Sequence, residues 1–177
     1  SSDLKKTEIN LETASGIKVL QLHLNTNKQQ VDSVTVDMLE PKLDVPAQYT
    51  GIAPDLSEFH LPLIKDASVH PTFVSMGNPH FVIFLEKEQI KDTNMLISDA
   101  ELTEFGHSLE HNTAFPERCN IEFACLTANN HLRTRVWERG SGITMACGTG
   151  SCATATAAIL NGLADRLKPV EIEMDGG

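Results

Sequence analysis

Residues 137–160 read Trp137-Glu-Arg-Gly-Ser-Gly-Ile-Thr-Met-Ala-Cys147-Gly-Thr-Gly-Ser-Cys-Ala-Thr-Ala-Thr-Ala-Ala-Ile-Leu160. No charged residue occurs between positions 145 and 164, and positions 153–160 are good helix formers apart from two threonines, so a helix is expected to begin near Gly150. A helix without a polar stripe is buried on all sides. We therefore predict that residues 151–160 form a central helix, more than about nine-tenths buried and surrounded by mostly antiparallel strands.

The first turn of this helix predicts an anion site. Gly148-Thr-Gly-Ser151 leaves backbone N–H groups without intrahelical partners, and the helix dipole is positive at the same end. Cys147 lies at the mouth of that site. Because the dipole and the N–H groups favour a thiolate, we expect the pKa of Cys147 to fall from about 8.5 towards neutrality. Cys147 is thus a candidate proton-transfer group or nucleophile.

Composition narrows the class of protein. The chain has 177 residues, of which 41% are hydrophobic and 21% charged, as in a globular protein of one sizeable domain or two small ones. A net charge of −10, with no cluster among the 14 Lys and Arg residues, argues against a nucleic-acid partner. No run is apolar enough for a membrane span. The four cysteines lack zinc-site spacing, so we expect no metal and reduced thiols in a cytoplasmic protein.

The first part of the chain predicts an incomplete domain. Strands are expected at residues 8–13, 17–24 and 31–38, followed by a proline-rich irregular segment over residues 40–70 that connects two domains. Three strands without a covering helix bury too little apolar surface to be stable alone. We assign residues 1–65 to the later strands of the first domain plus the connection, and residues 66–177 to the second domain.

The second domain alternates strands with helices. Strands at 72–75 and 81–85 flank Met76-Gly-Asn-Pro-His80. This connector is either a turn in which Asn78 bonds to nearby backbone groups or a polar segment that binds a ligand. Residues 98–110 predict an amphipathic helix capped by Ser98. Further strands are expected at 120–126, 131–137 and 170–174. These elements indicate an α+β fold.

Three separated motifs resemble a known family. They are Ser75-Met-Gly-Asn-Pro-His80, Pro116-Glu-Arg-Cys-Asn-Ile-Glu-Phe123 and Val136-Trp-Glu-Arg-Gly-Ser-Gly-Ile-Thr-Met-Ala-Cys-Gly-Thr-Gly150. In this order they resemble diaminopimelate epimerase, a pyridoxal-phosphate-independent amino-acid epimerase, and matches within residues 8–38 extend the resemblance over nearly the whole chain. The sequence departs from the family at Leu39, where glycine is usual, and at Cys119, where an aliphatic residue is usual.

The resemblance implies a fold and an activity. Family members have two pseudo-symmetric domains, each with a mostly antiparallel sheet wrapped around a central helix, and a catalytic cysteine at the start of each helix. Their reaction inverts an α-carbon, from LL- to meso-diaminopimelate, on the route to lysine and peptidoglycan, and it needs no cofactor. Only the second cysteine, Cys147, is in this sequence, so we expect a piece whose first domain is incomplete and which is inactive alone. The resemblance also implies a homodimer.

Inversion of a carbon centre requires a base on one face and an acid on the other, and thiols suit both roles. By the match, Cys147 is one of these groups, and the N–H groups of Gly148 and Thr149 bind the reacting carboxylate, where the dipole stabilises negative charge. The match implies that the distal end of the substrate is held by Asn78, Asn120 and Arg139. It also implies that Glu138 helps to bind the substrate, and that His80 with Glu138 supports the catalytic cysteines. An arginine suits a carboxylate because it can pair in a bidentate manner.

Other functions remain open on the sequence. Gly148-x-Gly150-x-x-Ala153, with Glu171 downstream, fits a dinucleotide fingerprint, but few residues follow for further parallel strands. A related cofactor-independent racemase or isomerase of the same fold is a second alternative. A non-catalytic binding protein is a third, because one of the two thiols is absent.

Overall fold

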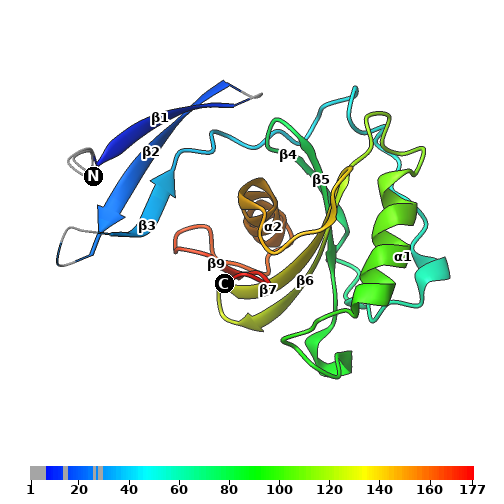
Figure 1. The fold of residues 1–177 in the computed structure, drawn as a ribbon. Coiled ribbons are helices and arrows are strands. Elements are labelled where there is room, and N and C mark those ends of the chain that lie inside the picture. The colour runs from blue at the N-terminus through cyan, green and yellow to red at the C-terminus, as the bar shows by residue number, and fades with distance from the viewer. Residues whose placement is uncertain (1–6, 14–15, 26, 28–29) are drawn as a thin grey trace. The chain divides into compact units, whose positions relative to one another are not determined.

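The computed structural model describes residues 7–13, 16–25, 27 and 30–177. The chain divides into two compact units, Ser1–Glu40 and Pro41–Gly177 (Figure 1). Each unit contains a β-sheet, and the two α-helices found among the described residues lie in the second unit. The α+β class predicted from the sequence is therefore confirmed.

The first unit is an antiparallel meander. Its strands are β1 (Glu8–Thr13), β2 (Gly16–Leu24) and β3 (Val31–Val36), in the order β1-β2-β3. The three predicted strands are confirmed, whereas the predicted turns at 14–16 and 25–30 fall partly outside the described residues. Apolar side chains on the strands are largely exposed, as in Ile17 at 68%. This exposure agrees with the expectation that three strands bury little surface.

The second unit is built on a mixed sheet. Its strands are β4 (Thr72–Ser75), β5 (Pro79–Phe84), β6 (Asn120–Ala128), β7 (His131–Glu138), β8 (Gly142–Ile143) and β9 (Glu171–Glu173). The order is β4-β5-β6-β7-β8, with β9 paired to β7. Pairing is antiparallel except between β5 and β6 and between β7 and β9. The short strand β8 was not predicted.

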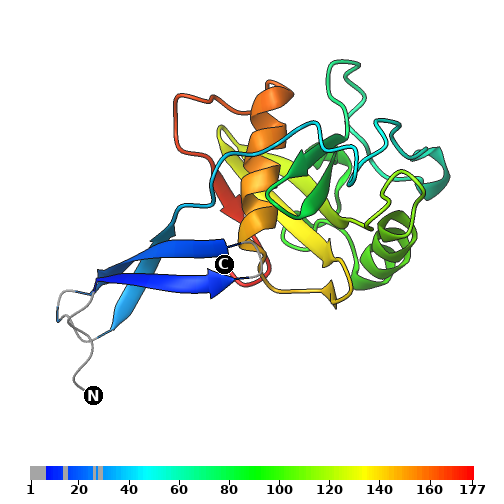
Figure 2. The same ribbon diagram turned by 90° about the horizontal axis from the view of Figure 1, so that it is seen from above.

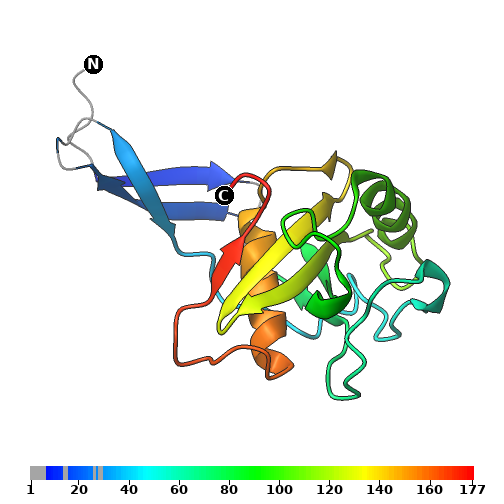
Figure 3. The same ribbon diagram turned by 90° about the horizontal axis from the view of Figure 1, so that it is seen from below.

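Strand alternation gives the sheet two different faces. On β6, the side chains of Ile121, Phe123 and Cys125 enter the main hydrophobic core, which lies on the side of α1 (Asp99–Glu110). The residues between them point to the opposite side, where α2 (Gly148–Leu160) lies. The two turned views show α1 and α2 on opposite sides of this sheet (Figures 2 and 3).

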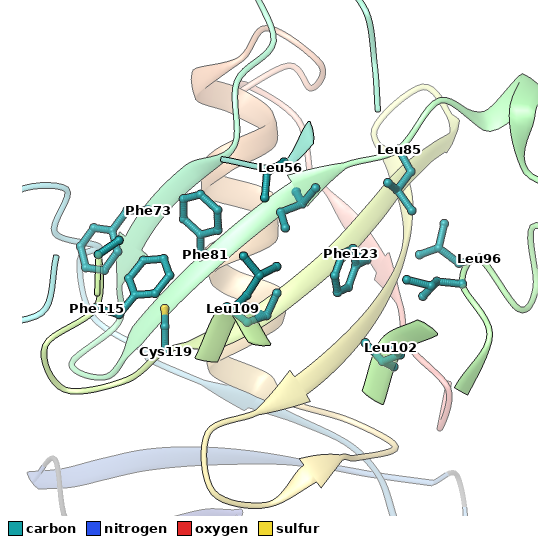
Figure 4. Packing of buried hydrophobic residues seen from close by; sticks show 14 of the residues in the cluster. Leu56, Phe73, Phe81, Leu85, Leu96, Leu102, Leu109, Phe115, Cys119 and Phe123 are labelled. Atoms are coloured by element: carbon teal, nitrogen blue, oxygen red, sulfur yellow. The ribbon is translucent and has the colours of Figure 1, made fainter. Parts of the chain in front are cut away.

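Helix α1 begins with the predicted cap. Ser98 and Glu101 form a capping box, in which the Ser98 hydroxyl accepts from the Glu101 N–H and the Glu101 carboxylate accepts from the Ser98 N–H. Leu102 and Leu109 are buried against the aromatic residues of the sheet (Figure 4). The helix predicted over residues 98–110 is therefore confirmed.

Residues 41–65, which we expected to be a connection, also cover the core. Leu56 is buried just before the 3₁₀ turn η1 (Ser57–Phe59), and the Tyr49 ring stacks on Phe73 with centroids 4.8 Å apart. A second 3₁₀ turn, η2 (Lys87–Gln89), follows β5. Residues 41–65 thus pack within the second compact unit. Their apolar side chains pack against the main hydrophobic core, on the face of the sheet that α1 also covers.

The prediction that the central helix is buried on all sides is wrong. The buried positions of α2 form one face, namely Gly150, Ala153, Thr154, Ala157 and Ala158. Positions 151, 152, 155, 156 and 159 are half-buried, and Leu160 is 52% exposed. The sheet covers one side of the helix only. Small residues without charge were read as a sign of complete burial, although here they serve close packing on a single face.

Candidate active site

Cys147 stands at the N-terminus of α2, where the sequence predicted it. It is the N-cap residue, and its sulfur accepts a hydrogen bond from the Gly150 N–H at 3.3 Å. The Cys147 N–H in turn donates to the thioether of Met174 at 3.2 Å. Gly148 is exposed and Thr149 half-buried, so this end of the helix is open to small molecules. Their N–H groups occupy the first two helical positions, which have no intrahelical acceptor.

A chain of hydrogen bonds links Cys147 to the β5 strand. The Cys147 sulfur lies 3.4 Å from the Thr149 hydroxyl, which accepts from the Asn78 side-chain amide at 3.3 Å. The other side of that amide, Asn78 Oδ1, is 3.2 Å from His80 Nε2. Gly77, with φ of 97°, permits the tight connection before Asn78. Four of the predicted site residues, Asn78, His80, Cys147 and Thr149, are thereby brought together. The connector over residues 76–80 makes a polar contact to the N-terminal end of α2.

His80 continues this chain into the interior. Its Nδ1 lies 2.6 Å from Oε1 of Glu122, and both side chains are completely buried. Glu122 lies directly beneath α2, because a Cβ placed on Gly150 would come within 2.8 Å of Oε1. Burial raises the pKa of Glu122, and interaction with His80 opposes that shift. Glu122 is not among the site residues predicted from the sequence, although a lone carboxylate in the apolar run 121–126 is a usable signal of a buried functional residue.

Glu138 and Arg139 lie at the end of β7. The Glu138 carboxylate accepts from the Thr144 hydroxyl at 2.5 Å, and the Arg139 guanidinium donates to the Glu117 carbonyl at 2.8 Å. Asn120 is buried, donates to the Pro79 carbonyl at 2.7 Å, and accepts from the Arg139 N–H at 2.9 Å. Asn120 therefore connects β5, β6 and the β7–β8 turn.

Glu110 fixes the position of that turn. Its carboxylate, 2% exposed, accepts from the Gly140 N–H at 3.0 Å, the Trp137 indole at 2.7 Å and the Arg118 guanidinium at 3.2 Å. A buried carboxylate with three charge-assisted bonds holds its donors in place. Glu110 thus anchors the segment that carries Glu138, a role that sequence reasoning missed.

The expected fall in the pKa of Cys147 is wrong. Burial raises the pKa of this thiol, and the carboxylates of Glu122 and Glu138 raise it further, whereas the bonds from Thr149 and Gly150 lower it. The helix N-terminus can be recognised in the sequence, whereas the burial of the thiol and the two nearby carboxylates arise only in the folded chain. Cys119, flagged as a departure from the family, is fully buried in the core on the α1 face (Figure 4).

The arrangement suits proton transfer by a thiol. A sulfur that accepts a hydrogen bond from Gly150 and shares one with the Thr149 hydroxyl, beside free helix N–H groups, can hold a proton, release it, and remain close to a bound anion. Within the described residues, no three His, Cys, Asp or Glu side chains are grouped as metal ligands, and no helix could span a membrane. The dinucleotide reading is disfavoured because β8 and residues 144–147 separate β7 from α2, whereas the fingerprint requires a direct strand-to-helix turn.

Comparisons with known proteins agree with these observations. The family model described as diaminopimelate epimerase matches residues 72–177. The diaminopimelate epimerase of Bacteroides thetaiotaomicron is 48% identical over 97% of this chain and 54% of its own length, and that of Phocaeicola vulgatus is 46% identical over 97% and 56%. The chain thus spans about half the length of the curated relatives it matches. A solved Bacillus anthracis phenazine biosynthesis protein of the PhzF family, 18% identical, covers 87% of this chain and 50% of its own with a TM-score of 0.50, which supports the fold alone.

Proposed function

The chain belongs to the diaminopimelate epimerase family, and we propose that it forms one half of an active site that converts LL- to meso-diaminopimelate by thiol acid/base chemistry. The observation that carries the proposal is Cys147 at the N-cap of α2, with the N–H groups of Gly148 and Thr149 beside it. The proposal includes a role in lysine and peptidoglycan precursor synthesis, without pyridoxal phosphate or another cofactor. It also includes a cytoplasmic location and a homodimer.

We assign the roles as follows. Cys147 exchanges the α-proton on one face of the substrate, and the N–H groups of Gly148 and Thr149 bind the reacting carboxylate. Because the helix end is positive, it stabilises the extra negative charge that develops when the proton leaves. The thiol acting on the opposite face belongs to the first domain, outside the 177 residues. Residues 1–65 then contribute later strands of that first domain plus the connection, and residues 66–177 form the second.

The distal end of the substrate is assigned to Asn78, Asn120, Glu138 and Arg139. Each amide uses one N–H in its internal bond, so a second hydrogen of Asn78 Nδ2 and of Asn120 Nδ2 is left over. The Arg139 guanidinium uses Nη1 for Glu117 and has further donors for a carboxylate. His80 supports Cys147 through Asn78 and Thr149.

The test is a chimera that supplies the remaining half of the site. Residues of the Bacteroides thetaiotaomicron relative that lie outside its match to this chain are joined to residues 7–177. We expect this chimera to convert LL- to meso-diaminopimelate and to incorporate solvent deuterium at the α-carbon, measured by chiral chromatography and mass spectrometry. The 177-residue chain alone should show no turnover, because losing one member of an acid/base pair costs orders of magnitude in rate.

Cys147→Ala should abolish turnover by the chimera, and Cys152→Ala is the matched control, because Cys152 is a half-buried thiol on the same helix. A folded chimera that racemises another amino acid but not diaminopimelate would favour the related racemase. Binding of diaminopimelate without any deuterium incorporation would favour a non-catalytic binding protein. Full activity of Cys147→Ala would refute the assignment of the thiol.

A further inference from the structure

Glu122 is a buried carboxylate that the proposed reaction does not use. Its side chain has no exposed surface, and only one of its oxygens, Oε1, bonds to His80. The other oxygen, Oε2, has no hydrogen-bond partner among the described residues. A buried carboxylate with an unbonded oxygen is costly to ionise. The charged form of Glu122 is therefore disfavoured, and binding a proton stabilises the side chain.

The carboxylate is close to the Cys147 sulfur. A Cβ placed on Gly150 would lie 2.8 Å from Glu122 Oε1 and 3.2 Å from Cys147 Sγ, so the two atoms are at most about 6 Å apart, the sum of these distances. Two negative charges at that separation in a buried site repel strongly. Ionisation of one group therefore opposes ionisation of the other.

The hydrogen bonds that connect the His80–Glu122 pair to Cys147 can donate in either of two directions along the chain. When His80 Nε2 carries a hydrogen, it donates to Asn78 Oδ1, Asn78 Nδ2 donates to Thr149, and the Thr149 hydroxyl donates to the Cys147 sulfur. That direction favours a thiolate. When His80 carries its hydrogen on Nδ1 and donates to Glu122, Nε2 accepts instead. Every bond then runs the other way, after rotation of the Asn78 amide, and the Cys147 S–H donates to Thr149.

We propose that Glu122 and Cys147 share a single negative charge, and that the buried His80–Glu122 pair takes up the proton that the Cys147 sulfur releases. The S–H bond of Cys147 breaks and an O–H bond forms at Glu122 Oε1, which then donates to His80 Nδ1 while His80 carries its hydrogen on Nε2. The thiolate replaces the carboxylate as the charged group, so the net charge stays at −1. No electrons are transferred to or from another molecule. Glu122 is then a positioning residue that provides a proton-accepting group close to the thiol. Cys147 matters here because the proposed function assigns it the proton transfer, but the test needs neither substrate nor turnover, so the two proposals fail separately.

The surrounding charges agree with one shared charge. Glu122 is faced by His80 from β5, Glu138 from β7, Cys147 from α2 and the buried thiol of Cys119, which directly precedes β6. Glu138 is a third carboxylate, half-buried and bonded to Thr144, and it raises the pKa of both Glu122 and Cys147. Burial is the largest cause of the raised pKa at each of the two sites. A second negative charge on the Glu122–Cys147 pair is disfavoured by burial and by Glu138, and the bonds from His80, Thr149 and Gly150 offset this only in part.

The test is a nuclear magnetic resonance titration of the 177-residue chain labelled with ¹³C at the cysteine Cβ and ¹⁵N in the histidine rings. Coupled groups titrate in two steps that belong to both. We therefore expect the Cys147 Cβ signal and the His80 ring nitrogens to show the same two midpoints. A comparison spectrum of His80→Gln identifies the His80 signals among the seven histidines. Independent single-step titrations of the two residues would overturn the proposal.

Glu122→Gln removes the carboxylate while keeping its shape. Cys147 should then titrate in one step, with its pKa lowered by between about half a unit and two units, which is the Coulomb effect of one charge at about 6 Å for effective dielectric constants from 80 to 20. Glu110→Gln is the matched control, because Glu110 is equally buried but bonds to Trp137 and Gly140 instead. An unchanged or raised pKa of Cys147 in folded Glu122→Gln, or an equal shift in Glu110→Gln, would contradict the proposal. The wild-type titration decides alone if Glu122→Gln does not fold.

Discussion

Replacing Gly106 by alanine should destabilise the second unit, although alanine is the better helix former. Gly106 lies in α1, and a Cβ there would come within 2.5 Å of both Cβ and Cγ of Trp137. Ordinary contacts of this kind are 3.4–4 Å, so a separation of roughly 1 Å more is required. Trp137 cannot give way easily, because it pairs with Ile121 and Ile143 and its indole bonds to Glu110.

The cost of the new contact and the gain in helix propensity decide whether Gly106→Ala stabilises or destabilises the fold. Forcing one methyl group into a packed site costs about 1–3 kcal/mol, and a backbone-linked neighbour places this case at the upper end. Alanine returns about 1 kcal/mol of helix propensity. The net expectation for Gly106→Ala is a loss of about 1–2 kcal/mol in the free energy of unfolding, which lowers the urea midpoint by about 0.5–1 M for a typical slope.

The assay is urea unfolding followed by fluorescence of Trp137, the one tryptophan in the sequence, and by far-ultraviolet circular dichroism. Ser108→Ala is the control, since Ser108 is exposed on the same helix and gains propensity without a new contact. A Gly106→Ala midpoint at or above those of the wild type and Ser108→Ala would refute the packing argument. It would mean that β7, and with it the segment that carries Glu138, can move aside at little cost.

Two further predictions concern the cap of α1 and the buried thiols. Ser98→Ala should lower the free energy of unfolding by about 1 kcal/mol, because it removes the capping box with Glu101, and a urea midpoint equal to that of Ser108→Ala would contradict this. Burial raises the pKa of Cys119 and Cys125, so the folded chain holds these thiol protons more tightly than the unfolded chain. Unfolding free energy under reducing conditions should therefore be constant below about pH 8.5 and fall above it, by up to about 1.4 kcal/mol per pH unit for each thiol. Cys125→Ala should flatten the decline, and a stability that rises from pH 8 to pH 10 would show that the sign is wrong.

The sequence by itself determined most of the secondary structure and the identity of the central helix. Helices and strands are specified largely by residues that are close in sequence. The Ser98 cap, the glycines at 148 and 150 and the alternation in 120–126 were therefore enough to predict α1, α2 and β6. Three spaced motifs also contained all of the predicted site residues, close to the ends of strands β5, β6 and β7 and of helix α2. Cys147 was placed at the helix N-terminus because its four following residues are small and polar or glycine.

Only the tertiary structure decided the electrostatics of the site and the extent of burial. A pKa depends on desolvation and on charges distant in sequence, and the distance between Glu122 and Cys147 arises only when β6 packs beneath α2. The same holds for Glu110, whose three donors come from positions 118, 137 and 140. The half-exposed face of α2 has the same origin, because residue composition specifies what a helix can tolerate, whereas the packing of the sheet specifies which of its sides is covered.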